Sequence, residues 1–328
     1  MGDMTEMTDL GKVSSLLGWP EKRKEIESTL RGLLGGLPAG RVEPQVKVTE
    51  ELESRSYTRR RVSFFVSEDE IVYGWLFVPD GKEETAAILC CHDKTTCGKD
   101  EPAGLDGNHR LAFAQHYAER GYITLAIDTA TAGERTSVKR QPYDTEVFYK
   151  DNPGLSLAGK MLADHMQAVE AFSEIKRVDT ARIGVIGHGL GGFNALMLAA
   201  FDDRVQACVS SNGFTRFATD KTPGMWADGT GLALIPEIAK IAAKKDAPDL
   251  DWEHILALAA PTAVQIITSV SNSIHVNPKS CQKAVNQAGR IYKLLGAQSA
   301  LNQFVNHDGN EFTPESLEVA DDWFERWL

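Results

Sequence analysis

Residues 181–200, ARIGVIGHGLGGFNALMLAA, combine an apolar strand, a glycine turn and an apolar helix around Gly189. This is the layout of a nucleophile elbow, Gly-x-Ser-x-Gly, in which a strained turn lifts the central residue over the end of a sheet. Gly187, Gly191 and Gly192 supply the flanking glycines. Gly189 stands at the nucleophile position, so the sequence predicts the turn without the hydroxyl that would attack a carbonyl.

A phosphate-binding loop is the competing interpretation of this turn, because helix N-termini attract anions. The Lys-Ser/Thr ending of a Walker motif is missing after the glycines. We therefore favour an elbow over a nucleotide site.

The elements that position the turn follow from hydrophobic periodicity. From residue 85 onward short apolar strands alternate with amphipathic helices, which is typical of parallel βαβ units covered on both faces. The predicted strands are 85–91, 122–127, 181–186, 205–210, 262–268 and 299–305, after a hairpin of 57–66 and 70–79. The predicted helices are 109–120, 156–176, 190–200, 279–295 and 314–327.

The predicted domain organisation has two parts. Residues 1–45 form a helical N-terminal extension, and residues 46–328 form the main domain. Two connections, 128–155 and 212–260, are too long for simple crossovers and follow the carboxyl ends of strands, where open α/β sheets bind ligands. We expect lid-like insertions there, with Tyr143 and Trp226 lining a ligand pocket.

Four segments besides the elbow carry a resemblance to a known family. They are WPEKRKEIESTLRGLLGGLP, AAILCCHDKTTCGKDEPAGLDG, YITLAIDTATAGER and HDGNEFTPE. With the elbow, they make the chain similar to the dienelactone-hydrolase and acetyl-xylan-esterase-like branch of the α/β hydrolases. The resemblance implies an α/β-hydrolase fold, with about eight mostly parallel strands flanked by helices.

The resemblance also assigns the other two triad positions. In that family a histidine follows the last strand in a Gly-His-x-Phe context, and here Asn310 occupies its place between Gly309 and Glu311. The acid comes from the loop after the preceding strand, where VSNSIHVNP puts Asn272, or Ser273, at that point. A serine needs a base and the base needs an acid, and neither glycine nor asparagine does either job.

Part of the catalytic apparatus is made of backbone and does not depend on these side chains. The resemblance implies oxyanion donors from the amide of Leu190 and from the loop near His92 or Asp93. Such a polarising site without a nucleophile would suit a small carbonyl compound, and lyase, isomerase or cyclase chemistry if another acid or base stood nearby.

Histidines near predicted strand ends are candidates for that acid or base: His92, His188, His275 and His307. His307 precedes Asn310 by three residues and is the preferred substitute. His188 alternatively braces the turn. No spacing of histidines and acidic residues resembles a metal ligand set, so we expect no metal and no cofactor.

The net charge of -11 argues against a nucleic-acid partner, which needs a concentrated basic surface. The acidic start, MGDMTEMTDLGK, lacks a secretion signal, and no run approaches the length of a membrane span. We expect a cytoplasmic protein with a small-molecule ligand and no membrane partner, and leave a homodimer open.

Three functions remain open at this point. The chain is an enzyme of non-acyl-enzyme chemistry on a small carbonyl, ester or lactone compound, a catalytically silent small-molecule-binding protein, or a carboxylester hydrolase inactivated at its nucleophile. Ionisable groups gathered around the elbow would favour the first.

Overall fold

The computed structural model describes residues 10, 13, 15–37, 42–219, 232–243, 249–270 and 277–328. Within these residues nine strands form one sheet in the order β1-β2-β3-β5-β4-β6-β7-β8-β9. The strands are β1 (Lys47–Glu53), β2 (Tyr57–Ser67), β3 (Glu70–Pro79), β4 (Thr85–Cys91), β5 (Ile123–Ile127), β6 (Val178–His188), β7 (Val205–Ser211), β8 (Ala263–Ser269) and β9 (Leu301–Asn306).

The sheet is mostly parallel, as the sequence predicts. Strands β5, β4, β6, β7, β8 and β9 pair in parallel, and β1, β2 and β3 add an antiparallel edge that joins β5. The sheet has one strand more than expected. That strand is β1, whose seven residues are all exposed, so no alternation of buried and exposed positions marks it in the sequence.

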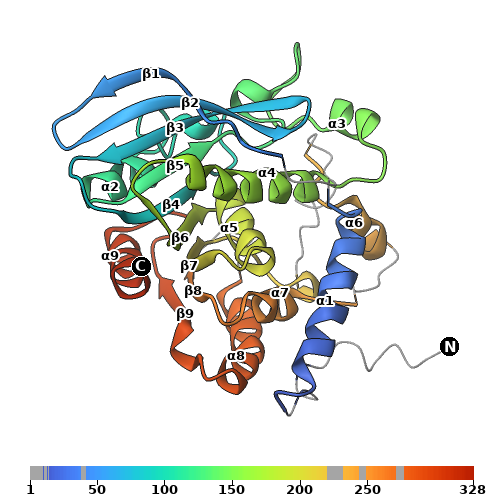
Figure 1. The fold of residues 1–328 in the computed structure, drawn as a ribbon. Coiled ribbons are helices and arrows are strands. Elements are labelled where there is room, and N and C mark those ends of the chain that lie inside the picture. The colour runs from blue at the N-terminus through green and yellow to red at the C-terminus, as the bar shows by residue number, and fades with distance from the viewer. Residues whose placement is uncertain are drawn as a thin grey trace.

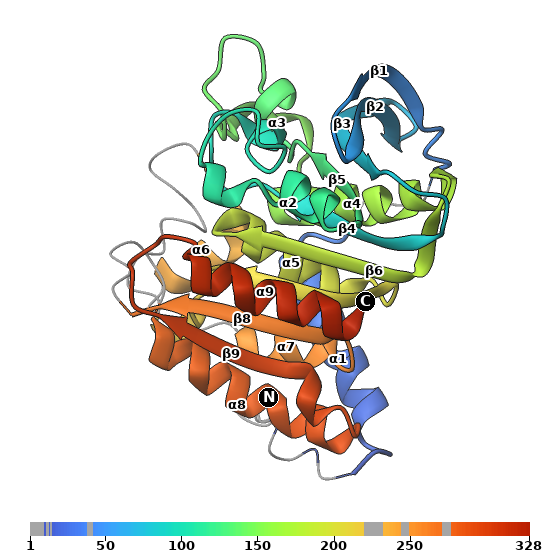
Figure 2. The ribbon, with the colours of Figure 1, turned by 90° about the vertical axis from the view of Figure 1, so that its left-hand side faces the viewer.

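Helices cover both faces of the sheet (Figures 1 and 2). They are α1 (Trp19–Leu33), α2 (Phe113–Glu119), α3 (Glu146–Asp151), α4 (Leu157–Ala171), α5 (Leu190–Phe201), α6 (Pro236–Ala243), α7 (Trp252–Ala259), α8 (Pro278–Leu294) and α9 (Pro314–Trp327). Helices α2 and α9 lie on one face, where Tyr117 meets Phe324 edge to face at 5.1 Å. Helices α4, α5, α7 and α8 lie on the other face.

The expected N-terminal helix is α1. Pro20 stands in its first turn, where a missing N–H loses no helical bond, and Trp19, Ile26 and Leu30 are its buried residues. These apolar positions recur at helical spacing and place α1 beside α7 (Figure 1). The helix is therefore part of the main body of the fold.

The two long connections contain short helices. Residues 128–155 hold α3, and the described part of 212–260 holds α6 and α7. Among the described residues, no helix combines the length and the apolar character needed to cross a membrane.

Candidate active site

The turn at Gly189 has elbow geometry. Strand β6 ends at His188, helix α5 begins at Leu190, and Gly189 between them has φ 53° and ψ −117°. This positive φ favours glycine over any residue with a Cβ. A Cβ on Gly187 would lie 2.2 Å from the carbonyl carbon of Gly191, so the glycines let strand and helix approach each other closely.

The carboxylate of Asp93 lies over the nucleophile position. The backbone N–H of Leu190 donates to Asp93 Oδ1 at 2.9 Å. A Cβ built on Gly189 would lie 2.1 Å from the same oxygen and 2.6 Å from Asp93 Cγ. A carboxylate oxygen therefore fills the space into which a nucleophile side chain at residue 189 would project.

This arrangement also bears on the phosphate-loop alternative. Gly187, Gly189 and Gly192 have the Gly-x-Gly-x-x-Gly spacing of a dinucleotide-binding loop. The helix N-terminus that would receive a pyrophosphate is occupied by the carboxylate of Asp93. A second anion there would meet like charge, so the structure gives the nucleotide interpretation no support.

The backbone of Asp93 is fixed by three donors to one carbonyl oxygen. His92 Nδ1 lies 2.7 Å from Asp93 O, the Tyr143 hydroxyl donates to it at 3.0 Å, and the backbone N–H of Thr95 donates at 2.8 Å. On the other side, the N–H of Asp93 donates to Glu101 Oε2 at 3.4 Å. The loop after β4 therefore holds the Cα of Asp93 in place while its half-buried side chain reaches the elbow.

His92 is a buried side chain in this loop, and both of its ring nitrogens make hydrogen bonds. The backbone N–H of Thr129 donates to His92 Nε2 at 3.0 Å, so Nε2 carries no proton and Nδ1–H donates to Asp93 O. Burial lowers the pKa of His92, which keeps the ring neutral. Both ring nitrogens are engaged by the protein, and the structure places His92 in a positioning role.

Tyr143 lies in the same cluster. Its single hydroxyl proton is shared between the carbonyl oxygens of Asp93 at 3.0 Å and Thr95 at 2.9 Å, and the hydroxyl oxygen accepts from the Thr95 N–H at 3.0 Å. Burial raises the pKa of Tyr143 well above its usual range. The hydroxyl of Tyr143 lies against the backbone of the loop, and a role for this residue in a ligand pocket stays a prediction.

Sequence reasoning missed Glu101, a second carboxyl group in this cluster. It is 4% exposed, and its two oxygens accept from the backbone N–H groups of Asp93 and Asn108 at 3.4 Å each. Burial raises its pKa to about 6, and the charge of Asp93 adds to the effect. The signal available in the sequence was the acidic composition of the run GKDEPAGLDG.

The loop that carries Glu101 is anchored by a buried ion pair. Lys99 Nζ lies 2.8 Å from Asp128 Oδ2, and the backbone N–H of Lys99 donates to Asp128 Oδ1 at 2.8 Å. Lys99 also contacts Glu134 Oε1 at 2.8 Å. Because Asp128 follows β5, this pair ties the loop after β4 to the neighbouring strand.

His188 and Asn310 meet beside the elbow. His188 Nδ1 lies 2.9 Å from the Ser211 hydroxyl, and the ring also makes a hydrogen bond with the backbone of Asn310. Burial lowers the pKa of His188, although that hydrogen bond and the charge of Asp93 oppose the effect. The ring of His188 is therefore held by Ser211 and by the backbone of Asn310, and its role stays a prediction.

The side chain of Asn310 belongs to a network of neutral polar groups. Its Oδ1 accepts from Asn212 Nδ2 at 3.1 Å, and Asn212 Nδ2 lies 3.1 Å from the Ser269 hydroxyl. Asn310 follows β9, Asn212 follows β7 and Ser269 is the last residue of β8, at the end of the sheet where the elbow lies. The position that the resemblance gives to a catalytic histidine is therefore close to the elbow and carries an amide.

The remaining predicted site residues are not brought to the elbow by the described contacts. His307 is exposed beyond β9. Asn272, Ser273, His275 and Trp226 lie outside the described residues. Among the described residues, no group of three or more histidine, cysteine or acidic side chains is arranged to hold a metal ion.

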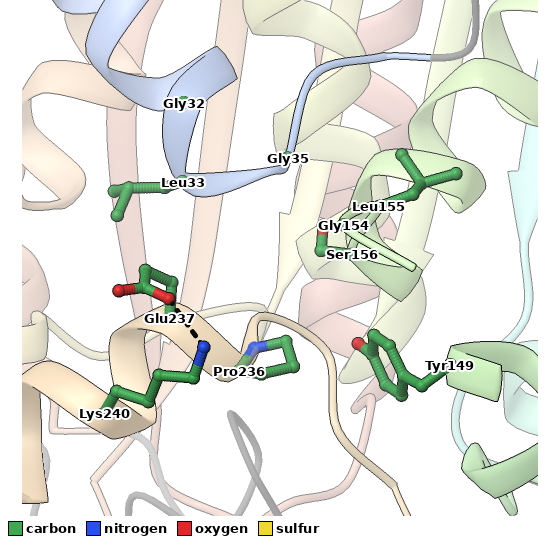
Figure 3. Close-up of a pocket in the computed structure, with 10 residues that line it drawn as sticks. All are labelled: Gly32, Leu33, Gly35, Tyr149, Gly154, Leu155, Ser156, Pro236, Glu237 and Lys240. Atoms are coloured by element: carbon green, nitrogen blue, oxygen red, sulfur yellow. Dashed lines mark hydrogen bonds and ion pairs between the residues drawn. The ribbon is translucent and has the colours of Figure 1, made fainter. Parts of the chain in front are cut away.

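Two hollows lie away from the elbow. One, of about 260 Å³, is lined by residues of α1 and α6 and by Tyr149 and residues 154–156 (Figure 3). The other, of about 530 Å³, lies between Trp19, Arg23 and Trp327 and residues at the starts of β7 and β8. Neither includes Gly189 or Asp93, so neither is the predicted ligand pocket.

The nine-stranded sheet and the elbow define an α/β-hydrolase fold. Residues 10–267 match the sequence model of the Abhydrolase family, and the chain belongs to this family. The family is of the esterase or hydrolase type within the α/β hydrolases.

Part of the chain is similar to curated proteins. The quorum-quenching protein AidA of Acinetobacter baumannii (strain MDR-ZJ06) is 26% identical over 154 residues, which are 46% of this chain and 43% of that protein. The chain spans less than half the length of the first curated relatives that it matches.

Among solved structures, a glucuronoyl esterase from Solibacter usitatus has a TM-score of 0.76 at 17% identity, covering 95% of this chain and 94% of that one. An acetyl xylan esterase from Paenibacillus sp. R4 has a TM-score of 0.62 at 15% identity and covers 99% and 98%. At this level of identity the likeness concerns the fold.

Proposed function

We propose that this chain acts on a small carbonyl, ester or lactone compound by chemistry that does not pass through an acyl-enzyme. The observation that carries the proposal is the pair Gly189 and Asp93. Residue 189 has no side chain to acylate, and the carboxylate of Asp93 fills the space above it. The esterases with the same fold act on ester compounds, which supports the substrate class.

The neighbouring positions support the same proposal. Asn310 and Asn212 form an amide network where the family resemblance expects a histidine. An amide cannot accept a proton from a serine or stabilise an imidazolium, so a serine restored at residue 189 would still lack its base. The carboxyl groups of Asp93 and Glu101 can carry a charge beside the elbow.

A second candidate function is silent binding of a small molecule. It is favoured by one contact, because the Leu190 N–H that would stabilise an oxyanion is already bound to Asp93. In that case the site holds a ligand and catalyses no reaction.

A homodimer and a cytoplasmic location stay predictions.

A fluorophosphonate probe tests the proposal. It phosphonylates an activated serine, so the protein should keep its unmodified mass after prolonged exposure, while an active serine esterase in the same tube is labelled completely. Stoichiometric labelling that maps to residues 187–192 would show that the elbow holds an activated nucleophile and would refute the proposal.

A further inference from the structure

Asp93 is an ionisable side chain that contacts the elbow directly. Its Oδ1 lies 2.9 Å from the Leu190 nitrogen and 2.1 Å from the Cβ that a nucleophilic residue would have at position 189. We propose that Asp93 is the catalytic base of this site and activates a water molecule for direct attack on the substrate carbonyl. The inference rests on the proposed function, since it supplies the chemistry that an acyl-enzyme would otherwise supply.

Two histidines at the elbow already make hydrogen bonds within the fold. The Nε2 of His92 accepts from the backbone N–H of Thr129, and its Nδ1 donates to Asp93 O. His188 is buried and bonded to Ser211 and to the backbone of Asn310. The carboxylate of Asp93 accepts at Oδ1 from the Leu190 N–H, and its residue is only partly buried.

The way Asp93 is held lets its side chain move while its backbone stays fixed. Its carbonyl oxygen accepts from His92, Tyr143 and Thr95, and its N–H donates to Glu101. None of these contacts involves the carboxylate. Rotation about the Cα–Cβ bond would release the Leu190 N–H to the carbonyl oxygen of a substrate and keep the carboxylate within reach of a water beside the carbonyl carbon.

The reaction balances without a further reactant. The Asp93 carboxylate takes a proton from water as the water oxygen bonds to the carbonyl carbon, and the C=O π electron pair moves to the oxygen held by Leu190 N–H. The tetrahedral intermediate then breaks its bond to the leaving oxygen, which takes the proton back from Asp93. The products are an acid and an alcohol, and Asp93 is again a carboxylate.

The weakness of a carboxylate as a base narrows the substrate class. A carboxylate is a weak base and removes a proton from water effectively only when the carbonyl is reactive and the leaving oxygen is stable as an anion. We therefore infer esters and lactones of phenol-like alcohols. An aryl lactone such as dihydrocoumarin and an aryl ester such as p-nitrophenyl acetate have this chemistry, and an alkyl lactone such as δ-valerolactone does not.

The test compares the wild type with Asp93→Asn on dihydrocoumarin and p-nitrophenyl acetate. Asparagine keeps an oxygen that can accept from Leu190 N–H, so the fold should persist, and turnover should fall by ~10²-fold or more. Asp93→Glu keeps a carboxylate and should retain part of the rate even if Asp93→Asn is unstable. Asp322→Asn, at an exposed position of α9, is the matched control and should leave the rate unchanged.

Other results would overturn the inference. An Asp93→Asn rate equal to the wild-type rate, or a wild type no faster than buffer on both aryl substrates, removes Asp93 as the base. A single turnover in 18O-labelled water that places label in the Asp93 carboxylate would show attack by Asp93 itself. An Asp93→Asn rate equal to the wild-type rate would overturn only the role of Asp93 and leave the proposed function intact. Label in the Asp93 carboxylate, or a wild type no faster than buffer, would overturn the proposed function as well, since attack by Asp93 itself forms an acyl-enzyme.

Discussion

The Asp93 carboxylate and the Leu190 amide, 97 residues apart in the chain, are joined by a hydrogen bond of 2.9 Å at the start of helix α5. A carboxylate at a helix N-terminus is favourable because the helix dipole and the unpaired N–H groups attract negative charge. The same contact places an acid or base group where this fold normally carries a serine. Structure and chemistry at the elbow therefore depend on one side chain.

The clash between residue 189 and Asp93 should appear in the free energy of unfolding. Gly189→Ala should destabilise the protein by about 1–3 kcal/mol, because the new Cβ meets Asp93 Oδ1 and the backbone has positive φ. When Gly189→Ala is combined with Asp93→Ala, the clash is absent and only the φ strain remains. The double variant should therefore lose less free energy of unfolding than the sum of the losses in the two single variants. Urea denaturation of all four proteins measures this, and additive effects would mean that the two side chains do not compete for space.

Restoring a serine should require removal of Asp93 as well. Gly189→Ser alone should add almost no esterase activity, since it lacks a base and meets the Asp93 carboxylate. Adding Asn310→His and Asn272→Asp should raise the rate of p-nitrophenyl acetate hydrolysis more than the product of the single effects, because triad residues act as a unit. Asp93→Ala in that triple variant should raise it further.

One outcome of the repair series would reassign the base. If Gly189→Ser alone gains activity that His307→Ala abolishes, then His307 already serves as the base, and the histidine position is not Asn310.

Glu101 should make the stability depend on pH. Its folded pKa of about 6 lies above the ordinary value of 4.5, so the folded state favours the protonated acid. The stabilisation is complete below the unfolded pKa and is lost as pH rises through about 6. Glu101→Gln stays neutral, so its free energy of unfolding relative to the wild type should rise by about 2 kcal/mol between about pH 4 and about pH 7. A difference that does not change with pH would mean that Glu101 titrates normally.

Tyr143 should support turnover through the position of Asp93. Tyr143→Phe removes a hydroxyl that contacts Asp93 O and both backbone groups of Thr95, and should cost about 1–3 kcal/mol of stability. It should also lower kcat with little change in KM, because the base is misplaced and the substrate contacts remain. The matched control is Tyr149→Phe, whose hydroxyl donates to Ala233 O at 2.6 Å beside the hollow in Figure 3. Equal losses of kcat in both variants would indicate a general effect of instability.

The fold was largely predictable from the sequence because its strands are buried and its helices amphipathic. The strand predicted at 205–210 is β7, and the helix predicted at 314–327 is α9. Strand β1 escaped prediction because all of its side chains are exposed. The short helices in the long connections were not predicted, because a helix of eight residues or fewer contains too few apolar positions to show a hydrophobic periodicity.

The site was predictable only in part, for a different reason. The elbow is a local motif, so its strand, turn and helix can be inferred from adjacent residues. The position of the Asp93 carboxylate depends on contacts with Tyr143, Glu101 and Leu190 across the fold, and no local pattern encodes them. Glu101 was missed because a charged residue in a loop is normally exposed.

The most direct test of turnover without an acyl-enzyme is rapid-quench mass spectrometry during hydrolysis of p-nitrophenyl acetate. Intact protein is quenched at times shorter than one turnover, and p-nitrophenol is measured in the same samples. The expected result is linear release of p-nitrophenol with no initial burst and no protein mass increased by one acetyl group. A burst of one equivalent together with an acetylated peptide that contains residues 187–192 would contradict the account.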